Sequence, residues 1–116
     1  MSWHVRLAAQ VDSDIEETIE WTRHFGAKQA RAYLQTITLA IEALVKGPDI
    51  PGARTRDDIR IGVRTLHIAW LGRRGRHFLI FIANPEKTIV VLRMLHESMD
   101  LPRHIEATEL LDRQTD

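Results

Sequence analysis

The stretch HFLIFIANPEKTIVVLRMLH, residues 77–96, decides the fold. Two runs rich in Ile, Val, Leu and Phe, residues 77–83 and 88–95, are separated by the four turn-type residues 84–87. This pattern predicts a β-hairpin. The first run is apolar at every position from Phe78 onward, so both of its faces need to be covered. We therefore expect it to be a central strand of the sheet.

Two further stretches have strand character. Residues 64–71 precede the hairpin, and the Gly-Arg-Arg-Gly sequence at 72–75 predicts a turn between them. Residues 3–7, Trp-His-Val-Arg-Leu, alternate apolar and polar side chains, as a half-buried strand does. Residues 48–60 are rich in Pro, Gly, Arg and Asp, which predicts a loop.

Two helices are predicted between the first strand and this loop. Ser13 and Glu16 form a Ser-x-x-Glu capping box, which predicts a helix beginning near Asp14. Gly26 ends that helix, and the second helix ends at Gly47, because the following proline cannot continue it. The second helix has an apolar stripe at spacings of three and four, which faces a core: Ala30, Tyr33, Leu34, Ile37, Ala40, Ile41 and Leu44.

The predicted order is β-α-α-β-β-β, followed by a short C-terminal helix that begins near Asp100. The fold class is α+β: an N-terminal strand and an antiparallel helical hairpin packed on one face of a small antiparallel β-sheet. A length of 116 residues fits one domain, residues 1–116, in which about 106–116 form a tail. Residues 97–116 carry two basic and six acidic side chains, so this end either docks on a basic part of the chain or frays.

The composition excludes several classes of site. The chain has 16 Lys and Arg, 16 Asp and Glu, and no cysteine. A disulfide scaffold, a cysteine-ligated metal centre and a thiol nucleophile are therefore excluded. The six histidines lack the spacing of a zinc site, and no phosphate-binding loop is present, so we expect no metal and no cofactor. The apolar runs are shorter than a membrane span and no signal-peptide pattern occurs, which predicts a cytoplasmic protein without a membrane partner.

Arginine and histidine gather in residues 47–96, which carry nine basic and four acidic side chains, a net charge of +5. Metal-independent RNA cleavage needs histidine for proton transfer and arginine for the charge of the phosphorane. The candidate catalytic set consists of His96, Arg54, Arg64 and Arg93. The same side chains suit a nucleic-acid-binding module without chemistry. Arg93 lies inside an apolar strand, so we expect a carboxylate of the chain, such as Asp100, to pair with it.

Several motifs follow one another along the chain. They are the helical pair Asp14-Ile15-x-x-x-Ile19-x-Trp21 and Ala30-x-x-Tyr33-x-x-x-Ile37, the pieces Pro51-Gly52-x-Arg54 and Gly62-Val63-Arg64, and the run VLRMLHESMD from Val91 to Asp100, with Arg103 and His104 after it. In this order they resemble toxins of the RelE/ParE superfamily from type II toxin–antitoxin systems, in its ParE branch. The resemblance runs from about Val5 to Ile105.

This resemblance implies a small bacterial toxin with a role in plasmid stabilisation. A co-expressed antitoxin neutralises such a toxin by wrapping its C-terminal segment around it in a hetero-oligomer. Relatives of the ParE type poison DNA gyrase, whereas relatives of the RelE type cleave mRNA on the ribosome with a basic set that commonly contains lysines, plus a terminal Tyr or His. This chain has only Lys28, Lys46 and Lys87, and its one tyrosine, Tyr33, lies in the helical stripe. The departure favours gyrase as the target, with ribosome-dependent cleavage of mRNA as the alternative.

The resemblance also assigns candidate binding residues. The candidates for contacting the target are Arg93, His96, Met99, Asp100, Arg103 and His104. The candidates for contacting the antitoxin are Ile15, Ile19, Trp21, Tyr33, Ile37 and Ile41. If the chain cleaves RNA, the catalytic residues are the histidine and three arginines named above.

Overall fold

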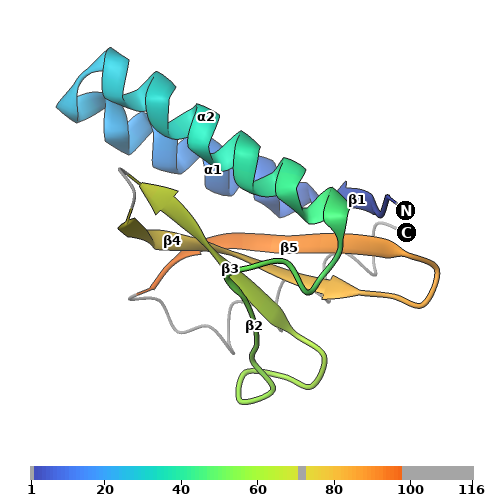
Figure 1. Cartoon of the computed structure of the whole chain (residues 1–116). Helices are drawn as coiled ribbons and strands as arrows, with labels where there is room; N and C mark the ends of the chain where they lie inside the picture. Colours follow the sequence, from blue (N-terminus) through green and yellow to red (C-terminus); the bar gives the residue numbers. More distant parts are fainter. Residues whose placement is uncertain (1, 71–72, 98–116) are drawn as a thin grey trace.

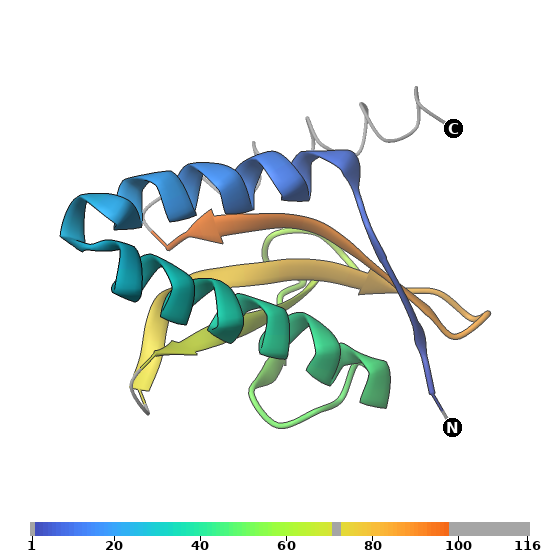
Figure 2. The same cartoon turned by 90° about the horizontal axis from the view of Figure 1, so that it is seen from above.

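The computed structural model describes residues 2–70 and 73–97 and has two layers, a helical hairpin and a five-stranded sheet. Figure 1 shows both long helices on one face of the sheet, and Figure 2 looks down on them from above. The elements are β1 (His4–Leu7), α1 (Ala9–Thr22), the 3-10 turn η1 (Arg23–Phe25), α2 (Ala27–Ala43), the 3-10 turn η2 (Leu44–Lys46), β2 (Ala53–Thr55), β3 (Arg64–Trp70), β4 (Arg73–Ala83) and β5 (Thr88–His96). The α+β class and the helical hairpin are confirmed. No helix in the described part of the chain is long and apolar enough to cross a membrane.

Strand β4 is central, as its apolar sequence predicts, because the strand order is β1-β5-β4-β3-β2. Its alternate side chains enter two separate apolar clusters. Leu79 and Phe81 pack toward the helices with Val11 and Ile37. The cluster on the opposite face contains Val63, Phe78, Ile80, Val90, Leu92 and Leu95. Both faces of the hairpin are therefore buried, which explains why its sequence shows no polar alternation.

The sheet is mixed, where the sequence predicted an antiparallel one. Strand β1 pairs with β5 in parallel, with His4 opposite Thr88 and Leu7 opposite Val91. The remaining pairs, β2–β3, β3–β4 and β4–β5, are antiparallel. A four-residue strand alternates in the same way whichever direction its neighbour runs, so the residue pattern carries no information on this point.

Helix α1 begins at Ala9, five residues before the predicted start at Asp14. The N-cap residue before it, Ala8, makes no side-chain cap, and the backbone N–H of Ala8 donates to the Val91 carbonyl at 2.9 Å. The Ser13-to-Glu16 capping box is therefore wrong, because these residues already lie inside the helix. Asp14 is buried and makes contacts elsewhere, as described below.

Two other local predictions are corrected. The predicted 48–60 loop contains the short strand β2, and the predicted turn at 72–75 is largely strand, because β4 already begins at Arg73. Both segments are rich in arginine and glycine, residues whose side chains give little strand signal. The helix ends at Gly26 and Gly47 are confirmed, with φ angles of 126° and 119° that suit glycine. The predicted C-terminal helix near Asp100 lies outside the described residues.

Candidate functional site

Arg93, the candidate cation inside β5, is bound by a carboxylate from the first helix. Its Nε donates to Asp14 Oδ2 and its second terminal nitrogen donates to Asp14 Oδ1, both at 2.8 Å. Asp14 is only 6% exposed. The sequence predicted that a carboxylate of the chain, such as Asp100, pairs with Arg93; Asp14 supplies such a carboxylate, and Asp100 lies outside the described residues. A fork-shaped guanidinium on both carboxylate oxygens is the strongest geometry available to such a pair.

The same carboxylate also completes the edge of β5. Strand β1 covers β5 only as far as Val91. Beyond that point, the Met94 backbone N–H donates to Asp14 Oδ2 at 3.0 Å. A buried N–H without an acceptor is costly, so Asp14 takes the place of a neighbouring strand here.

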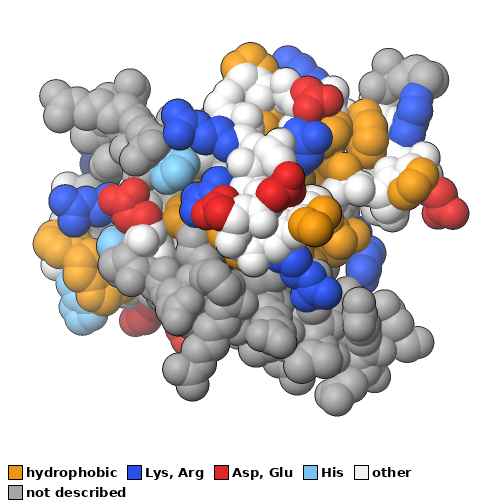
Figure 3. All heavy atoms as spheres, turned by 90° about the horizontal axis from the view of Figure 1, so that it is seen from below, with side chains coloured by type: hydrophobic (Ala, Val, Ile, Leu, Met, Phe, Trp, Pro, Cys, Tyr) orange, Lys and Arg blue, Asp and Glu red, His pale blue; other side chains and the backbone are white. Residues whose placement is uncertain are grey.

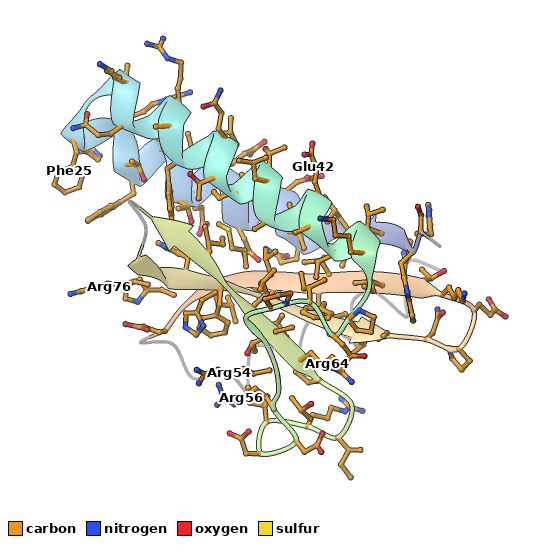
Figure 4. All side chains as sticks on the ribbon, in the orientation of Figure 1. Phe25, Glu42, Arg54, Arg56, Arg64 and Arg76 are labelled. Carbon is orange, nitrogen blue, oxygen red and sulfur yellow. The ribbon has the colours of Figure 1, made fainter. Side chains whose placement is uncertain are left out.

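The arginines of the candidate catalytic set do not gather around His96. Arg64 is held by Asp49 at 2.8 Å and by the Pro48 carbonyl at 3.3 Å, next to the end of the helical hairpin. Arg54 is exposed on the edge strand β2. Figure 4 shows Arg54, Arg64 and Arg76 at three separate places along the sheet. Because Arg93 is bound to helix α1, the set is dispersed over the molecule.

The face of the sheet opposite the helices carries charges of both signs. Figure 3 shows its Lys and Arg side chains (blue) interspersed with Asp and Glu (red) among the described residues. Arg56, for example, binds both carboxylate oxygens of Asp58 at 2.9 Å. The positive charge of residues 47–96 is therefore partly compensated within the fold, and the side chains that the structure describes do not form one uniform basic surface.

His96, the last residue of β5, belongs to a cluster with His77, which lies opposite it in the first half of β4. Its ring lies edge-on to the ring of His77, with 5.2 Å between centroids, and the Tyr33 hydroxyl lies 2.9 Å from His77 Nδ1. Burial lowers the pKa of His77, the neighbouring charge of His96 lowers it further, and Glu97 opposes the shift. Burial raises the pKa of Tyr33 to about 12. The cluster was missed from the sequence, although His77 alternates with Leu79 and so had to face the helices.

Half of the candidate antitoxin-binding residues lie in the core. Ile19, Tyr33 and Ile37 are buried, Ile37 completely, and Ile15 and Ile41 are partly buried against the same cluster. Trp21 is 65% exposed and stacks at a tilt on Phe25, with centroids 4.9 Å apart. Leu34, which the sequence placed in the stripe facing the core, is 42% exposed, and Phe25, Leu39 and Ile61 are further exposed apolar side chains among the described residues.

Four of the candidate target-binding residues, Met99, Asp100, Arg103 and His104, lie outside the described residues. Within residues 2–70 and 73–97, no three His, Asp or Glu side chains gather as metal ligands.

Comparisons with known proteins give a consistent result. A family model described as the ParE toxin of the type II toxin–antitoxin system parDE matches residues 5–101. Toxin ParE1 from two strains of Mycobacterium tuberculosis is 33% identical over 106 residues, which cover 90% of this chain and 100% of that protein. A chain of the crystal structure of the toxin–antitoxin complex RelBE2 from M. tuberculosis superposes with a TM-score of 0.51 at 20% identity, covering 83% of this chain and 99% of that chain. At this identity, the last comparison shows the shared fold alone.

Proposed function

Because the chain belongs to the ParE toxin family of type II toxin–antitoxin systems, we propose that it poisons DNA gyrase by direct binding and that a cognate antitoxin neutralises it. The proposal places the chain in the bacterial cytoplasm, where gyrase acts, and includes a role in plasmid stabilisation. The target-binding residues are those at the end of β5 and in the segment that follows it.

The observation that carries this proposal is the Asp14–Arg93 contact. An arginine that stabilises a phosphorane has to aim its N–H groups at the phosphate oxygens. In this fold, two donors of Arg93 are held by a buried carboxylate at 2.8 Å. Arg64 donates a single hydrogen bond to the exposed carboxylate of Asp49. Two of the three arginines named for cleavage, Arg64 and Arg93, therefore make contacts within the fold, which supports binding over RNA chemistry.

One observation favours the alternative, a ribosome-dependent mRNA endoribonuclease. The rings of His77 and His96 are neighbours, and burial lowers the pKa of His77, which disfavours the charged form of this ring as a general base requires. Two titratable groups with different environments are a common acid–base arrangement. Against this reading, Tyr33 already occupies the Nδ1 side of His77.

The experiment that separates the two functions measures the effect of the chain on gyrase and its effect on mRNA. Under the proposal, expression of the chain induces the SOS response, leaves mRNA intact by primer extension, and inhibits supercoiling by purified gyrase. His96→Ala is then expected to affect gyrase inhibition only as the loss of one contact at a binding surface does. Codon-positioned cuts that decline about 100- to 10,000-fold in His96→Ala would instead establish proton transfer by this side chain and overturn the proposal.

A further inference from the structure

Tyr33, His77 and His96 form a chain of polar contacts that leads from α2 to the last residue of β5. Tyr33 is buried in the core cluster beneath the helices, and the two histidines are half-buried. The other buried residues of that cluster in the described part of the chain are apolar. A hydroxyl and an imidazole cost desolvation free energy at such a site, which Phe or Leu would avoid. Packing alone therefore does not account for this pair.

The Tyr33 hydroxyl fixes the ring of His77. Its oxygen lies 2.9 Å from Nδ1 of His77. Burial raises the pKa of Tyr33 to about 12, so the hydroxyl stays protonated at neutral pH and can donate to Nδ1. A neutral imidazole whose Nδ1 accepts a hydrogen bond carries its proton on Nε2. Burial and the neighbouring charge of His96 lower the pKa of His77, against the opposing effect of Glu97, and this favours the neutral ring.

His77 in turn fixes the ring of His96. The two residues lie directly opposite each other in the β4–β5 register. Their rings meet edge to face, with an angle of 82° between the planes and 5.2 Å between the centroids. Because Tyr33 holds the first ring from α2, the second ring has a defined orientation at the end of β5. A side chain that is already oriented in the free protein loses less conformational entropy when it binds.

The acidic residue that follows β5 serves the other face of the sheet. A carboxylate oxygen of Glu97 lies 3.9 Å from Nε2 of His67. The ring of His67 lies against Phe78, which belongs to the cluster opposite the helices. Successive residues of an extended chain face opposite sides, so the Glu97 carboxylate is engaged away from the ring of His96.

We propose that Tyr33 and His77 are positioning residues for target binding: the Tyr33 hydroxyl fixes His77, and His77 presents the ring of His96 to gyrase in its binding orientation. The inference rests on the proposed function, because it takes His96 as part of the gyrase contact. It adds two residues that act on the target only through His96. Tyr33, a candidate for antitoxin contact by resemblance, thereby receives a role from inside the fold.

A double-variant cycle tests whether Tyr33 acts through His96. Tyr33→Phe keeps the ring in the core and removes only the hydroxyl, and it is expected to weaken gyrase inhibition about fivefold, the equivalent of one ordinary hydrogen bond. The combination of Tyr33→Phe with His96→Ala is expected to inhibit as His96→Ala alone does, because no ring remains to be positioned. Additive losses in the double variant would overturn the proposal.

A matched core variant controls for lost stability. Ile89→Val shortens a fully buried side chain of the same cluster near the start of β5, far along the strand from His96. The stability cost of such a truncation is similar to that of one lost hydrogen bond. Ile89→Val is expected to leave gyrase inhibition unchanged at a temperature where all variants are folded. A loss equal to that in Tyr33→Phe would show that inhibition follows stability and would overturn the proposal.

Imidazole NMR of the full-length chain tests the geometry without gyrase. Long-range ¹H–¹⁵N spectra are expected to show His77 with its proton on Nε2, and NOEs are expected between the ring protons of His77 and His96. In Tyr33→Phe the titration midpoint of His77 should rise, because the hydroxyl that stabilised the neutral ring is gone, and the NOEs should weaken. Ile89→Val should change neither. A proton on Nδ1 of His77, or NOEs that Tyr33→Phe leaves intact, would overturn the positioning role.

The two assays fail in distinguishable ways. If the native chain does not inhibit gyrase, the proposed function is overturned together with the target-binding role of this contact chain, whatever the NMR spectra show. If the chain inhibits gyrase and the NMR or double-variant result is negative, the positioning role alone is overturned and the proposed function stands.

Discussion

Asp14 of helix α1 binds Arg93 of strand β5 through two hydrogen bonds of 2.8 Å, although 79 positions separate them in the sequence. A third hydrogen bond joins the same carboxylate to the Met94 backbone at 3.0 Å. The contact therefore fastens the helical layer to the sheet at the point where β1 no longer covers β5.

Asp14→Ala is expected to lower the free energy of unfolding by about 3–5 kcal/mol, because it leaves the guanidinium of Arg93 and the Met94 N–H without their buried acceptor. Urea denaturation measures the change. Glu17→Ala, an exposed acidic residue on the same helix, is the control and changes stability by less than about 0.5 kcal/mol.

A double variant tests whether apolar side chains can replace the Asp14–Arg93 ion pair. Asp14→Leu combined with Arg93→Met removes both charges and is expected to be more stable than Asp14→Ala, because well-packed apolar side chains can replace a buried ion pair. A loss below about 1 kcal/mol in Asp14→Ala would show that the contact is dispensable.

Stability is expected to fall as the pH drops below about 6.5. Burial lowers the pKa of His77 in the folded chain below its ordinary value of 6.5, so the unfolded chain takes up a proton first. Since stability rises with pH wherever the unfolded state binds more protons, acidification through this range destabilises the fold. His77→Gln should flatten this part of the profile relative to the native chain in urea titrations at several pH values. The exposed His24→Gln is the control, and an unchanged slope in His77→Gln would contradict the assignment.

Ile37 is expected to act on stability and Leu39 on the surface only, although both lie on α2. Ile37 is completely buried, so Ile37→Ala should cost about 2–5 kcal/mol of unfolding free energy. Leu39 is 65% exposed, so Leu39→Ala should stay within about 0.5 kcal/mol. Thermal unfolding of the two variants side by side checks the difference. A smaller loss of unfolding free energy in Ile37→Ala would contradict the placement of Ile37 in the core.

Arg76 is expected to contribute to target binding. It is exposed near the start of β4, and its carbonyl accepts a hydrogen bond from the Glu97 N–H at 2.9 Å, so it lies beside the end of β5. Arg76→Glu should weaken gyrase inhibition several-fold, because exposed charges at an interface contribute modestly and steer association. Arg31→Glu on α2 is the matched reversal and should leave inhibition unchanged. Equal losses in both variants would indicate a general charge effect.

The parts of the fold that the sequence predicts are those held by local pattern. The β4–β5 hairpin is readable because two apolar runs flank the turn at Asn84, and α2 is readable from its stripe and from Gly47. The start of α1 was misplaced because Ser13 and Glu16 match a local cap pattern, whereas Asp14 makes its contacts to a strand that lies far along the chain. Local rules do not contain that information.

The candidate site was less predictable for the same reason. That Arg93 needs a carboxylate follows from its apolar neighbours, but which carboxylate depends on how α1 crosses the end of β5. The Tyr33–His77 contact likewise requires knowing that α2 lies over β4. Charge counting over residues 47–96 suggested a basic surface, yet pairs such as Arg56 with Asp58 neutralise part of it within the fold.

The parallel pairing of β1 with β5 has a consequence for the timing of synthesis. His4 can pair with Thr88, and Asp14 can bind Arg93, only after those later residues have been synthesised. A nascent chain on the ribosome therefore cannot complete its sheet until nearly all of it has been translated. At about 5–20 residues per second, a chain of 116 residues takes roughly 6–23 s to make. The sheet is thus incomplete for most of this interval, and the proposed gyrase binding, which needs the folded chain, is expected to begin only after Thr88 and Arg93 have been translated.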